Sequence, residues 1–191
     1  MGLFVIEMSP PAEPFDLYTQ IAEQLLLLRC QLGDNDALAE LIRRYQTPLH
    51  GYIENLINAS DFVDDISQDT WLTVIRQIRT LRNLHAFQVW MYRIARNKAL
   101  KKLGKQKFVP LCDDNIPVQN TQQDSLLSTI NIADLRHGLT KLSIHYREIL
   151  LLHFFQHMSY QQISDIVGCP VGTVKSRLYY AKRELKKELE K

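Results

Sequence analysis

Residues 159–179 constrain the fold of this chain more than any other part of the sequence. Ser159 and Gln162 have the spacing of a capping box, which predicts a helix that begins directly after the serine. Gly168 can adopt the left-handed conformation that ends such a helix, and Pro170 suits the start of the next one because its missing N–H has no helical partner there. The stretch therefore predicts two helices joined by a tight turn.

The side chains of these two helices divide into a buried and an exposed face. The apolar residues with helical spacing, expected in the core, are Ile163, Ile166, Val167, Val174, Leu178 and Ala181. On the opposite side of the second helix, near its N-terminus, lie Gly172, Lys175, Ser176 and Tyr179. This arrangement is typical of a DNA-binding helix-turn-helix, whose second helix contacts base edges in the major groove. An ordinary helical hairpin with a basic outer face is the alternative.

The remainder of the chain also has helical periodicity, and no segment alternates polar and apolar residues over the length of a strand. We expect an all-α fold with two small helical domains. Residues 104–131 are polar, contain two prolines and predict a flexible linker. The expected division is an N-terminal extension (1–24), a first helical domain (25–103), this linker and a helix-turn-helix domain (132–191). Residues 1–16 are expected to form a flexible tail, and Pro48 to mark the end of one helix or the first turn of the next.

The distribution of charge is more informative than its average. The formal net charge is only +2, which taken alone argues against a strongly basic nucleic-acid-binding protein. Residues 76–107, however, contain ten Lys and Arg side chains and no Asp or Glu. A solvated helix face is one explanation. Because aromatic residues are interleaved with the cations, the run is also typical of a surface that binds nucleic acid.

Within this run, Phe87 and Trp90 have the spacing of core residues, and we expect them mainly to pack the helical bundle. The polar candidates for nucleic-acid contact are Arg93, Arg96, Asn97 and Lys101. An asparagine amide can form paired hydrogen bonds with a base edge, whereas the cations can neutralise phosphates.

Other classes of site find no support in the sequence. The three cysteines are scattered singly, which predicts a reducing, cytoplasmic setting without disulfides. His153 and His157 have the i, i+4 spacing of a metal pair, but the general-base Glu of a zinc protease helix is absent, so we expect packing and surface roles. We expect no enzymatic activity, no metal and no cofactor. Neither a signal peptide nor a membrane span is expected.

Several separate motifs, in order along the chain, resemble the sigma-70 family of bacterial RNA polymerase sigma factors, in particular its extracytoplasmic-function (ECF) group. They are Leu41–Tyr45 after Gly33-Asp34, Asp64–Trp71, Phe87–Asn97, Leu142–Leu152 and the helix-turn-helix Tyr160–Leu178. The resemblance runs from about residue 26 to residue 187, apart from the linker. It implies a protein that binds core RNA polymerase and directs it to promoters.

The resemblance also implies roles for individual residues. Those that would dock on the polymerase are Asp64, Asp65, Gln68 and Asp69. Those that would hold the single-stranded −10 element, with a base pocket at the loop, are Arg82, Asn83, Leu84, His85, Arg93, Arg96, Asn97 and Lys101. Those that would contact the duplex −35 element are Gly172, Thr173, Lys175, Ser176, Arg177, Tyr179, Tyr180 and Arg183.

The expected partners are core RNA polymerase, promoter DNA and an anti-sigma factor, and the chain is expected to be a monomer when free of them. The alternative function is a stand-alone helix-turn-helix regulator whose first domain binds another protein. Such a regulator would bind a specific duplex without polymerase.

Overall fold

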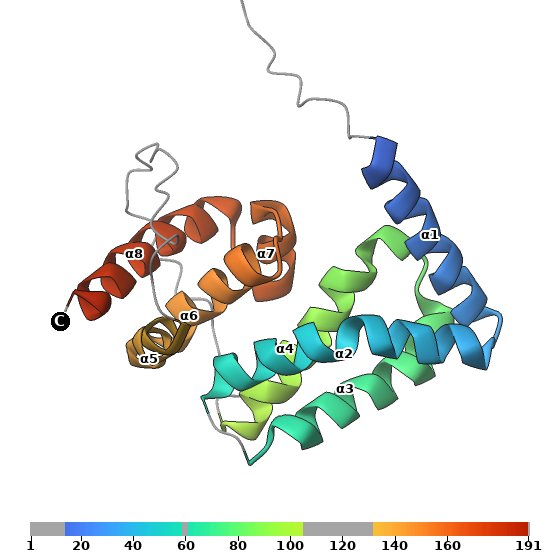
Figure 1. Ribbon diagram of the computed structural model, residues 1–191, viewed down its shortest axis with the longest axis horizontal. Coiled ribbons are helices and arrows are strands. Elements are labelled where there is room, and N and C mark those ends of the chain that lie inside the picture. The colour runs from blue at the N-terminus through green and yellow to red at the C-terminus, as the bar shows by residue number, and fades with distance from the viewer. Residues whose placement is uncertain (1–13, 59–60, 105–131, 191) are drawn as a thin grey trace, which may run out of the picture.

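The computed structural model describes residues 14–58, 61–104 and 132–190, and in these ranges the regular secondary structure is entirely helical (Figure 1). The first group of helices comprises α1 (Pro14–Gln31), α2 (Asn35–Ile57), α3 (Val63–Gln77) and α4 (Phe87–Lys102). The second group comprises α5 (Ile132–Lys141), α6 (Ile144–Leu150), α7 (Tyr160–Val167) and α8 (Val171–Leu189). This confirms the all-α prediction.

Helix α1 begins earlier than the sequence predicts. The expected tail includes residues 14–16, but these are the first turn of α1, and the helix runs without a break across the expected boundary between residues 24 and 25. Leu26, Leu27 and Cys30 on one face of α1 are buried against α2. Burial of this face stabilises the helix, because a single helix of this length is marginal in water by itself. Residues 1–13 lie outside the described residues.

Helix α2 is continuous through Pro48, where the sequence predicts a boundary between two helices. A proline inside a helix removes one backbone hydrogen bond. The buried side chains of Tyr45, Leu49 and Tyr52 lie on both sides of Pro48 along one face, and their packing holds the two halves of α2 in one helix. The Asp34 carboxylate caps the start of α2 by accepting hydrogen bonds from the backbone N–H groups of Asp36 and Ala37.

Helices α2, α3 and α4 pack on one another, with α1 against α2 (Figure 1). Two short 3₁₀ turns, Ile78–Thr80 and Leu84–Ala86, lie on either side of the loop that joins α3 to α4. Aromatic rings fill the middle of this bundle: Tyr45 meets Phe87 edge-on with ring centroids 5.4 Å apart, and Tyr52 meets Tyr92 at 5.1 Å. Phe87 is therefore a core residue, as predicted, while Trp90 is partly buried beside it.

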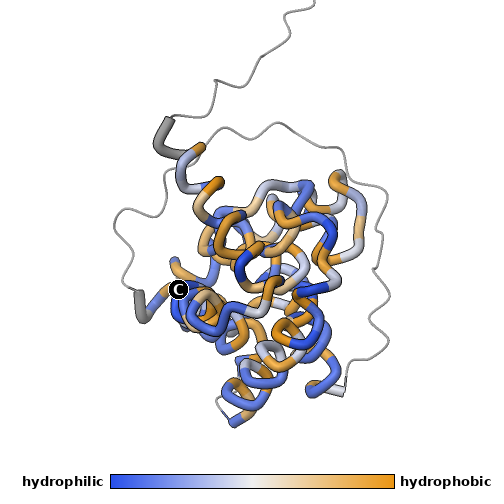
Figure 2. Tube along the Cα trace, turned by 90° about the vertical axis from the view of Figure 1, so that its right-hand side faces the viewer, coloured by the Kyte–Doolittle hydropathy of each residue, from blue (hydrophilic) through white to orange (hydrophobic). Residues whose placement is uncertain are grey.

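The second group is built around α8, which packs against α5, α6 and α7. A π-helical turn, Leu151–Phe155, continues α6. Hydrophilic and hydrophobic residues alternate along the helices of both groups (Figure 2), so that each helix has an apolar side for the core.

The two groups pack against each other instead of standing apart. Helix α4 contacts α7, and α2 contacts α5 and α6, so that the buried apolar side chains form one continuous cluster. The predicted linker lies outside the described residues from residue 105 to residue 131.

Candidate nucleic-acid and polymerase interfaces

The helix-turn-helix is formed by α7 and α8, and its local geometry matches the prediction. The Ser159 hydroxyl and the Gln162 side chain form the reciprocal capping box at the start of α7. Gly168 ends α7 in the left-handed conformation, with φ of 75°. The Ser164 hydroxyl then donates a hydrogen bond to the Cys169 carbonyl at 2.6 Å, which holds the turn. Pro170 occupies the position directly before α8, without a side-chain capping hydrogen bond. The predicted core residues of both helices are buried.

The exposed face of α8 presents a cluster of cationic and aromatic groups. Lys175, Tyr179 and Arg183 are exposed at one-turn intervals, and Gly172 is exposed one turn before them. Nζ of Lys175 lies 5.8 Å from the centre of the Tyr160 ring on α7. These groups form a continuous polar face next to the N-terminus of the helix, which can contact the edges of base pairs.

Thr173 and Arg177 differ from the prediction, because both are buried inside the helix-turn-helix domain. The Thr173 carbonyl accepts a hydrogen bond from the half-buried Ser176 hydroxyl, and Nη1 of Arg177 lies 4.0 Å from the Cys169 sulfur beneath the turn. Their helical positions lie next to the recognition face, but both side chains are buried, and that of Arg177 lies beneath the turn. Tyr180 is half-buried, with its ring edge-on to that of Tyr179 at 5.2 Å.

Helix α4 places three of its four predicted polar residues on the surface. Arg93, Asn97 and Lys101 are exposed and follow one another at one-turn spacing, so they form a straight row. Arg96 is the exception. It is buried, and its partner comes from the other group of helices, as described below.

The loop before α4 is held by α1. Arg82, Asn83 and His85 are exposed and Leu84 is partly buried. The Asn83 side chain accepts a hydrogen bond from the backbone N–H of His85, which shapes the turn.

Two glutamines of α1 attach the helix to this region. The Gln31 amide donates to the carbonyls of Ile78 and Leu81 at 2.9 and 2.7 Å, and the Gln24 amide lies 3.0 Å from the His85 ring. Sequence reasoning missed both glutamines, because nothing in their local pattern indicates contact with residues that lie 47 to 61 positions away.

The acidic residues of α3 lie on one exposed face, as the resemblance implies. Asp64, Asp65, Gln68 and Asp69 are exposed above the buried Ile66 and Trp71. Asp64 lies 3.1 Å from the His50 ring, and Asp65 lies 3.7 Å from Nζ of Lys102. Exposed pairs of this kind contribute little to stability, so both carboxylates remain available to a binding partner.

A buried charged contact joins the two groups of helices. Nε of Arg96 on α4 donates to Oε1 of Glu148 on α6 at 2.6 Å, and the Tyr52 hydroxyl on α2 donates to the same oxygen at 3.3 Å. Burial raises the pKa of Glu148 above its ordinary value, although both partners counteract this effect.

Neighbouring hydrogen bonds reinforce this contact. The Arg147 guanidinium donates to the Leu56 carbonyl of α2 at 3.1 Å and, on its own side, to the Leu139 carbonyl at 2.8 Å. The Tyr92 hydroxyl donates to the Gln156 side chain. Sequence reasoning missed Glu148, although a glutamate next to the apolar run 149–152 is a signal of a buried, paired carboxylate.

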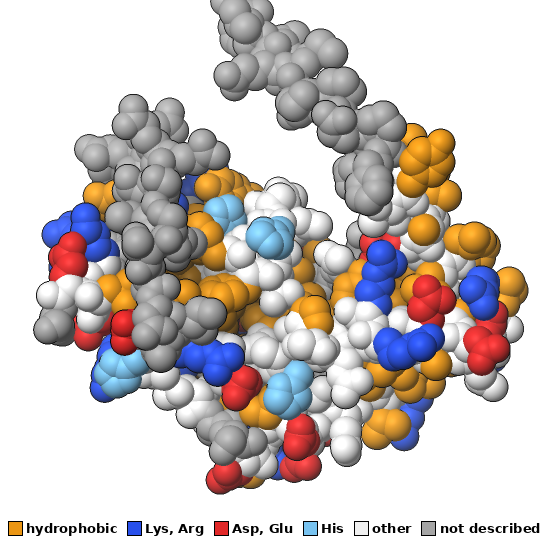
Figure 3. All heavy atoms as spheres, in the orientation of Figure 1, with side chains coloured by type: hydrophobic (Ala, Val, Ile, Leu, Met, Phe, Trp, Pro, Cys, Tyr) orange, Lys and Arg blue, Asp and Glu red, His pale blue; other side chains and the backbone are white. Residues whose placement is uncertain are grey.

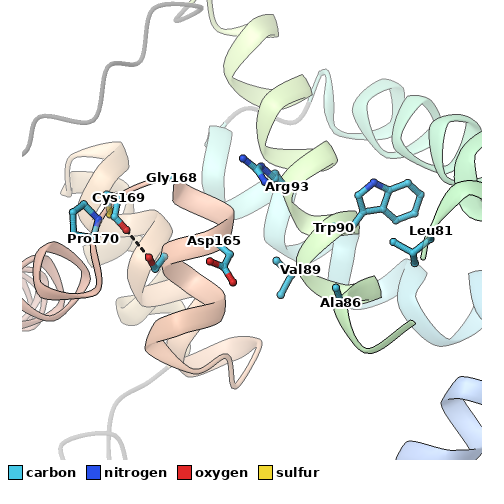
Figure 4. A pocket seen from close by; sticks show the side chains of 10 residues that line it. Leu81, Ala86, Val89, Trp90, Arg93, Asp165, Gly168, Cys169 and Pro170 are labelled. Carbon is cyan, nitrogen blue, oxygen red and sulfur yellow. Dashed lines mark hydrogen bonds between the residues drawn. The ribbon is translucent and has the colours of Figure 1, made fainter. Parts of the chain in front are cut away.

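A groove of about 700 Å³ lies between α4 and α7 (Figure 4). Arg93 and Asp165 are the charged side chains among the described residues that line it. The remaining lining residues are Leu81, Ala86, Val89, Trp90, Ser164, Gly168, Cys169 and Pro170. The groove thus lies between the cationic helix and the turn of the helix-turn-helix.

Two segments of the chain match two families of sigma factor domains. Residues 41–109 match the Sigma-70 region 2 family, and residues 132–185 match the Sigma-70 region 4 family. The chain is 29% identical to an ECF RNA polymerase sigma-E factor of Haemophilus influenzae, over 90% of this chain and 97% of that protein. It is 30% identical to the ECF RNA polymerase sigma-E factor of Escherichia coli, over 87% of this chain and 93% of that protein.

Solved structures share the fold. One is the structure of CnrH in complex with the cytosolic domain of CnrY, with 20% identity, a TM-score of 0.65 and coverage of 88% of this chain and 97% of that one. Another is the sigma factor RpoE in complex with the anti-sigma factor NepR from Bartonella quintana, with 23% identity, a TM-score of 0.62 and coverage of 80% and 96%.

These findings define a transcription initiation factor that directs RNA polymerase to promoters. The chain belongs to the sigma-70 family, as a sigma factor of the ECF group. Among the described residues, no helix is both long enough and apolar enough to cross a membrane.

Proposed function

We propose that this sigma factor contacts a promoter at two separate places through the residues that its structure exposes. The exposed face of α8 would enter the major groove of the −35 element, with Lys175, Ser176 and Tyr179 near base edges. Arg183 one turn later would contact the phosphate backbone, together with Lys186 and Lys187. The exposure of this face, directly above a well-capped turn, is the observation that carries the proposal.

The row Arg93, Asn97 and Lys101 on α4 would hold the single-stranded −10 element. The two cations would neutralise phosphates, while the Asn97 amide would contact a base. Residues 82–85, held by the Gln31 hydrogen bonds to the carbonyls of Ile78 and Leu81, would form the wall of the pocket for an unstacked base. We assign no catalytic step to any of these groups.

The acidic face of α3 would dock on the polymerase. Asp64, Asp65, Gln68 and Asp69 share that face, and their carboxylates suit a basic surface on the partner. The face lies on α3, a different helix from α8 and α4, although Asp65 is 3.7 Å from Nζ of Lys102 on α4. Polymerase and DNA would be bound at the same time through these different helices.

The packed arrangement of the two groups of helices would be a closed state. Arg96 belongs to the predicted −10 surface by its place on α4, but its guanidinium is held in the ion pair with the Glu148 carboxylate. It is therefore not available to DNA in this arrangement. Separation of α4 from α6 would return Arg96 to the surface beside Asn97. The closed state would therefore compete with promoter binding.

We propose an anti-sigma factor as a further partner. The structural neighbour from Bartonella quintana is a sigma factor in complex with an anti-sigma factor. In this chain, the groove is lined by α4, which would contact the −10 element, and by α7 and the turn that leads into α8. A polypeptide bound there would hold the closed state and cover Arg93.

Reconstituted transcription tests the proposal. The purified chain is mixed with bacterial core RNA polymerase and a promoter library, and the transcript start sites are mapped. Specific starts that depend on both the chain and the core enzyme are expected. Specific duplex binding by the free chain, without association with the core enzyme, would instead support the stand-alone regulator.

Variants of α4 separate opening of the promoter from binding of the polymerase. Asn97→Ala should reduce permanganate reactivity of the −10 element with little change in affinity for the core enzyme, because Asn97 belongs to α4 whereas the proposed polymerase contacts belong to α3. Asp65→Lys is the matched control, with the opposite expectation of weaker binding to the core enzyme. Equal loss of both properties in both variants would contradict the separation of these surfaces.

A further inference from the structure

One amide of α1 holds both ends of the turn that leads into the loop 82–85. Nε2 of Gln31 donates to the Ile78 carbonyl at 2.9 Å and to the Leu81 carbonyl at 2.7 Å. Ile78 begins the 3₁₀ turn, and at Leu81 the chain leaves the turn in an extended conformation. Because hydrogen bonds to carbonyl groups are directional, this amide fixes the direction in which the chain enters the loop.

The hydrogen bonds inside the loop set its shape but not its orientation. The Asn83 side chain accepts a hydrogen bond from the backbone N–H of His85, and the Asn83 carbonyl accepts one from Ala86, so both bonds join neighbouring residues of the loop. The partly buried Leu81 and Leu84 attach the loop to the core, but apolar contacts are not directional. The orientation of the loop relative to the bundle therefore depends on its polar contacts with α1.

Two further contacts join the end of α1 to the same region. The Gln24 amide lies 3.0 Å from the His85 ring. Gly33, just after α1, has φ of 89°, and a Cβ at this position would lie 2.8 Å from Nη2 of Arg79. The Arg79 guanidinium, which belongs to the 3₁₀ turn, thus lies against the glycine backbone, where a larger residue would displace it.

The two glutamines lie on one side of α1. Gln24 and Gln31 are seven residues apart, which is about two helical turns, so their side chains point in nearly the same direction. Another side of α1 carries exposed apolar residues, among them Leu25 and Leu28, and apolar side chains are visible over α1 at the right of Figure 3. Both glutamines precede residues 41–109, which match the region 2 family, so that match assigns them no role.

We propose that Gln31 is a positioning residue that determines how strongly the −10 pocket selects its base. This inference rests on the proposed function of residues 82–85 as the wall of that pocket. Selection among bases requires donors and acceptors at defined places along the base edge, so a tilt of the loop lowers the preference for one base. Contacts with phosphates carry no sequence information, so the cations of α4 would still hold the strand.

Gln31→Met tests the proposal, because methionine has a similar length but no N–H donor. The holoenzyme is reconstituted from the full chain and core RNA polymerase, and transcripts are counted from promoters that carry each base at each −10 and −35 position. The preference for the best base over the worst should fall about tenfold at one −10 position. It should keep its wild-type value at every −35 position. A defect of folding alone would lower transcription from all promoters equally and leave these ratios unchanged.

Two further variants serve as controls. Gln77→Met makes the same substitution at an exposed glutamine at the end of α3, next to the same 3₁₀ turn, and should keep all the ratios. Gln31→Lys keeps N–H donors on a long side chain and should restore most of the preference that Gln31→Met loses. Circular dichroism of the three variants establishes that the fold is intact, which is expected because Gln31 is only half-buried.

The outcomes separate this inference from the proposed function. The role of Gln31 would be overturned, with the proposed function intact, if Gln31→Met kept the wild-type preference at every −10 position. The same conclusion would follow if Gln77→Met lost the preference equally or if Gln31→Lys restored none of it. A wild-type holoenzyme without base preference anywhere in the −10 element would overturn the proposed function and this inference with it.

Discussion

Nε of Arg96 lies 2.6 Å from Oε1 of Glu148, and the two side chains, which come from different groups of helices, are 10 and 1% exposed. This pair explains why a cation in the middle of the predicted DNA surface is not on the surface. Burial of two charges is unfavourable unless each satisfies the other, and here the Tyr52 hydroxyl provides a further hydrogen bond to the carboxylate.

Removal of one member of the pair should destabilise the packed arrangement. Arg96→Leu removes the strongest cationic neighbour of the buried Glu148 carboxylate and leaves only the weaker influence of Arg177, which costs about 3–5 kcal/mol. We expect either a loss of this size in the free energy of unfolding, measured with urea, or separation of the two groups of helices, seen as a larger radius of gyration in X-ray scattering.

Arg93→Leu is the control for this variant, because Arg93 is an exposed arginine nearly one turn earlier on α4. It should change the free energy of unfolding by no more than about 0.5 kcal/mol. The double variant Arg96→Leu with Glu148→Leu should recover part of the lost stability, because the unpaired carboxylate is gone while Arg177 stays buried. No recovery would argue against the ion pair as the cause.

Alkaline pH should weaken the contact between the two groups of helices. Burial raises the pKa of both Tyr52 and Tyr92 above the ordinary value of tyrosine, and the hydroxyls of both hydrogen-bond across the contact. A phenol with a raised pKa in the folded state contributes stability that is present below the unfolded pKa of about 10 and is lost as the pH rises through the folded pKa.

The free energy of unfolding should therefore fall with rising pH above about 10, while phenolate absorbance shows these tyrosines ionising after the exposed ones. Tyr92→Phe removes one such group and should make the fall less steep. If all tyrosines of the folded chain ionise together near about pH 10, the prediction is wrong.

Two glycines of the helix-turn-helix should respond in opposite ways to alanine. Neither has an atom within 4 Å of an added Cβ, but Gly168 has φ of 75° whereas Gly172 is helical. Gly168→Ala should cost about 1–2 kcal/mol, because the left-handed conformation is strained for alanine. Gly172→Ala should stabilise by about 0.5–1 kcal/mol. Thermal unfolding of both variants measures the two changes in stability. A similar change in both would contradict the backbone conformation as the cause of the difference.

Two lysines of α8 should differ in what they contribute to DNA binding. Lys175→Ala should cost about 1–3 kcal/mol of discrimination at one −35 position, because this lysine lies on the face next to base edges. Lys187→Ala, three turns later and 2.7 Å from Glu184, should weaken binding almost equally across sequences. Competition between promoter variants for the reconstituted holoenzyme measures both effects. Equal selectivity of Lys175→Ala and the wild type would refute the proposed register of α8.

The helix-turn-helix and the helical class followed from local sequence. The capping box of Ser159 and Gln162, the left-handed Gly168 and the apolar spacing of α7 and α8 each involve residues within a few positions of one another. Such features predict the same local structure in most surroundings, and the structure contains all of them. The all-α class, the exposure of the α3 carboxylates and the core position of Phe87 could be predicted for the same reason.

Only the tertiary structure decided which cations are buried. Arg93 and Arg96 look alike in sequence, but Glu148 reaches one of them from fifty-two residues away. Long-range packing also decided that α2 continues through Pro48 and that α1 leaves an apolar row exposed. The physical reason is that periodicity shows which residues share a face of a helix. Whether that face is buried, and which opposite charge meets a cation on it, depends on segments that come together only after the chain has folded.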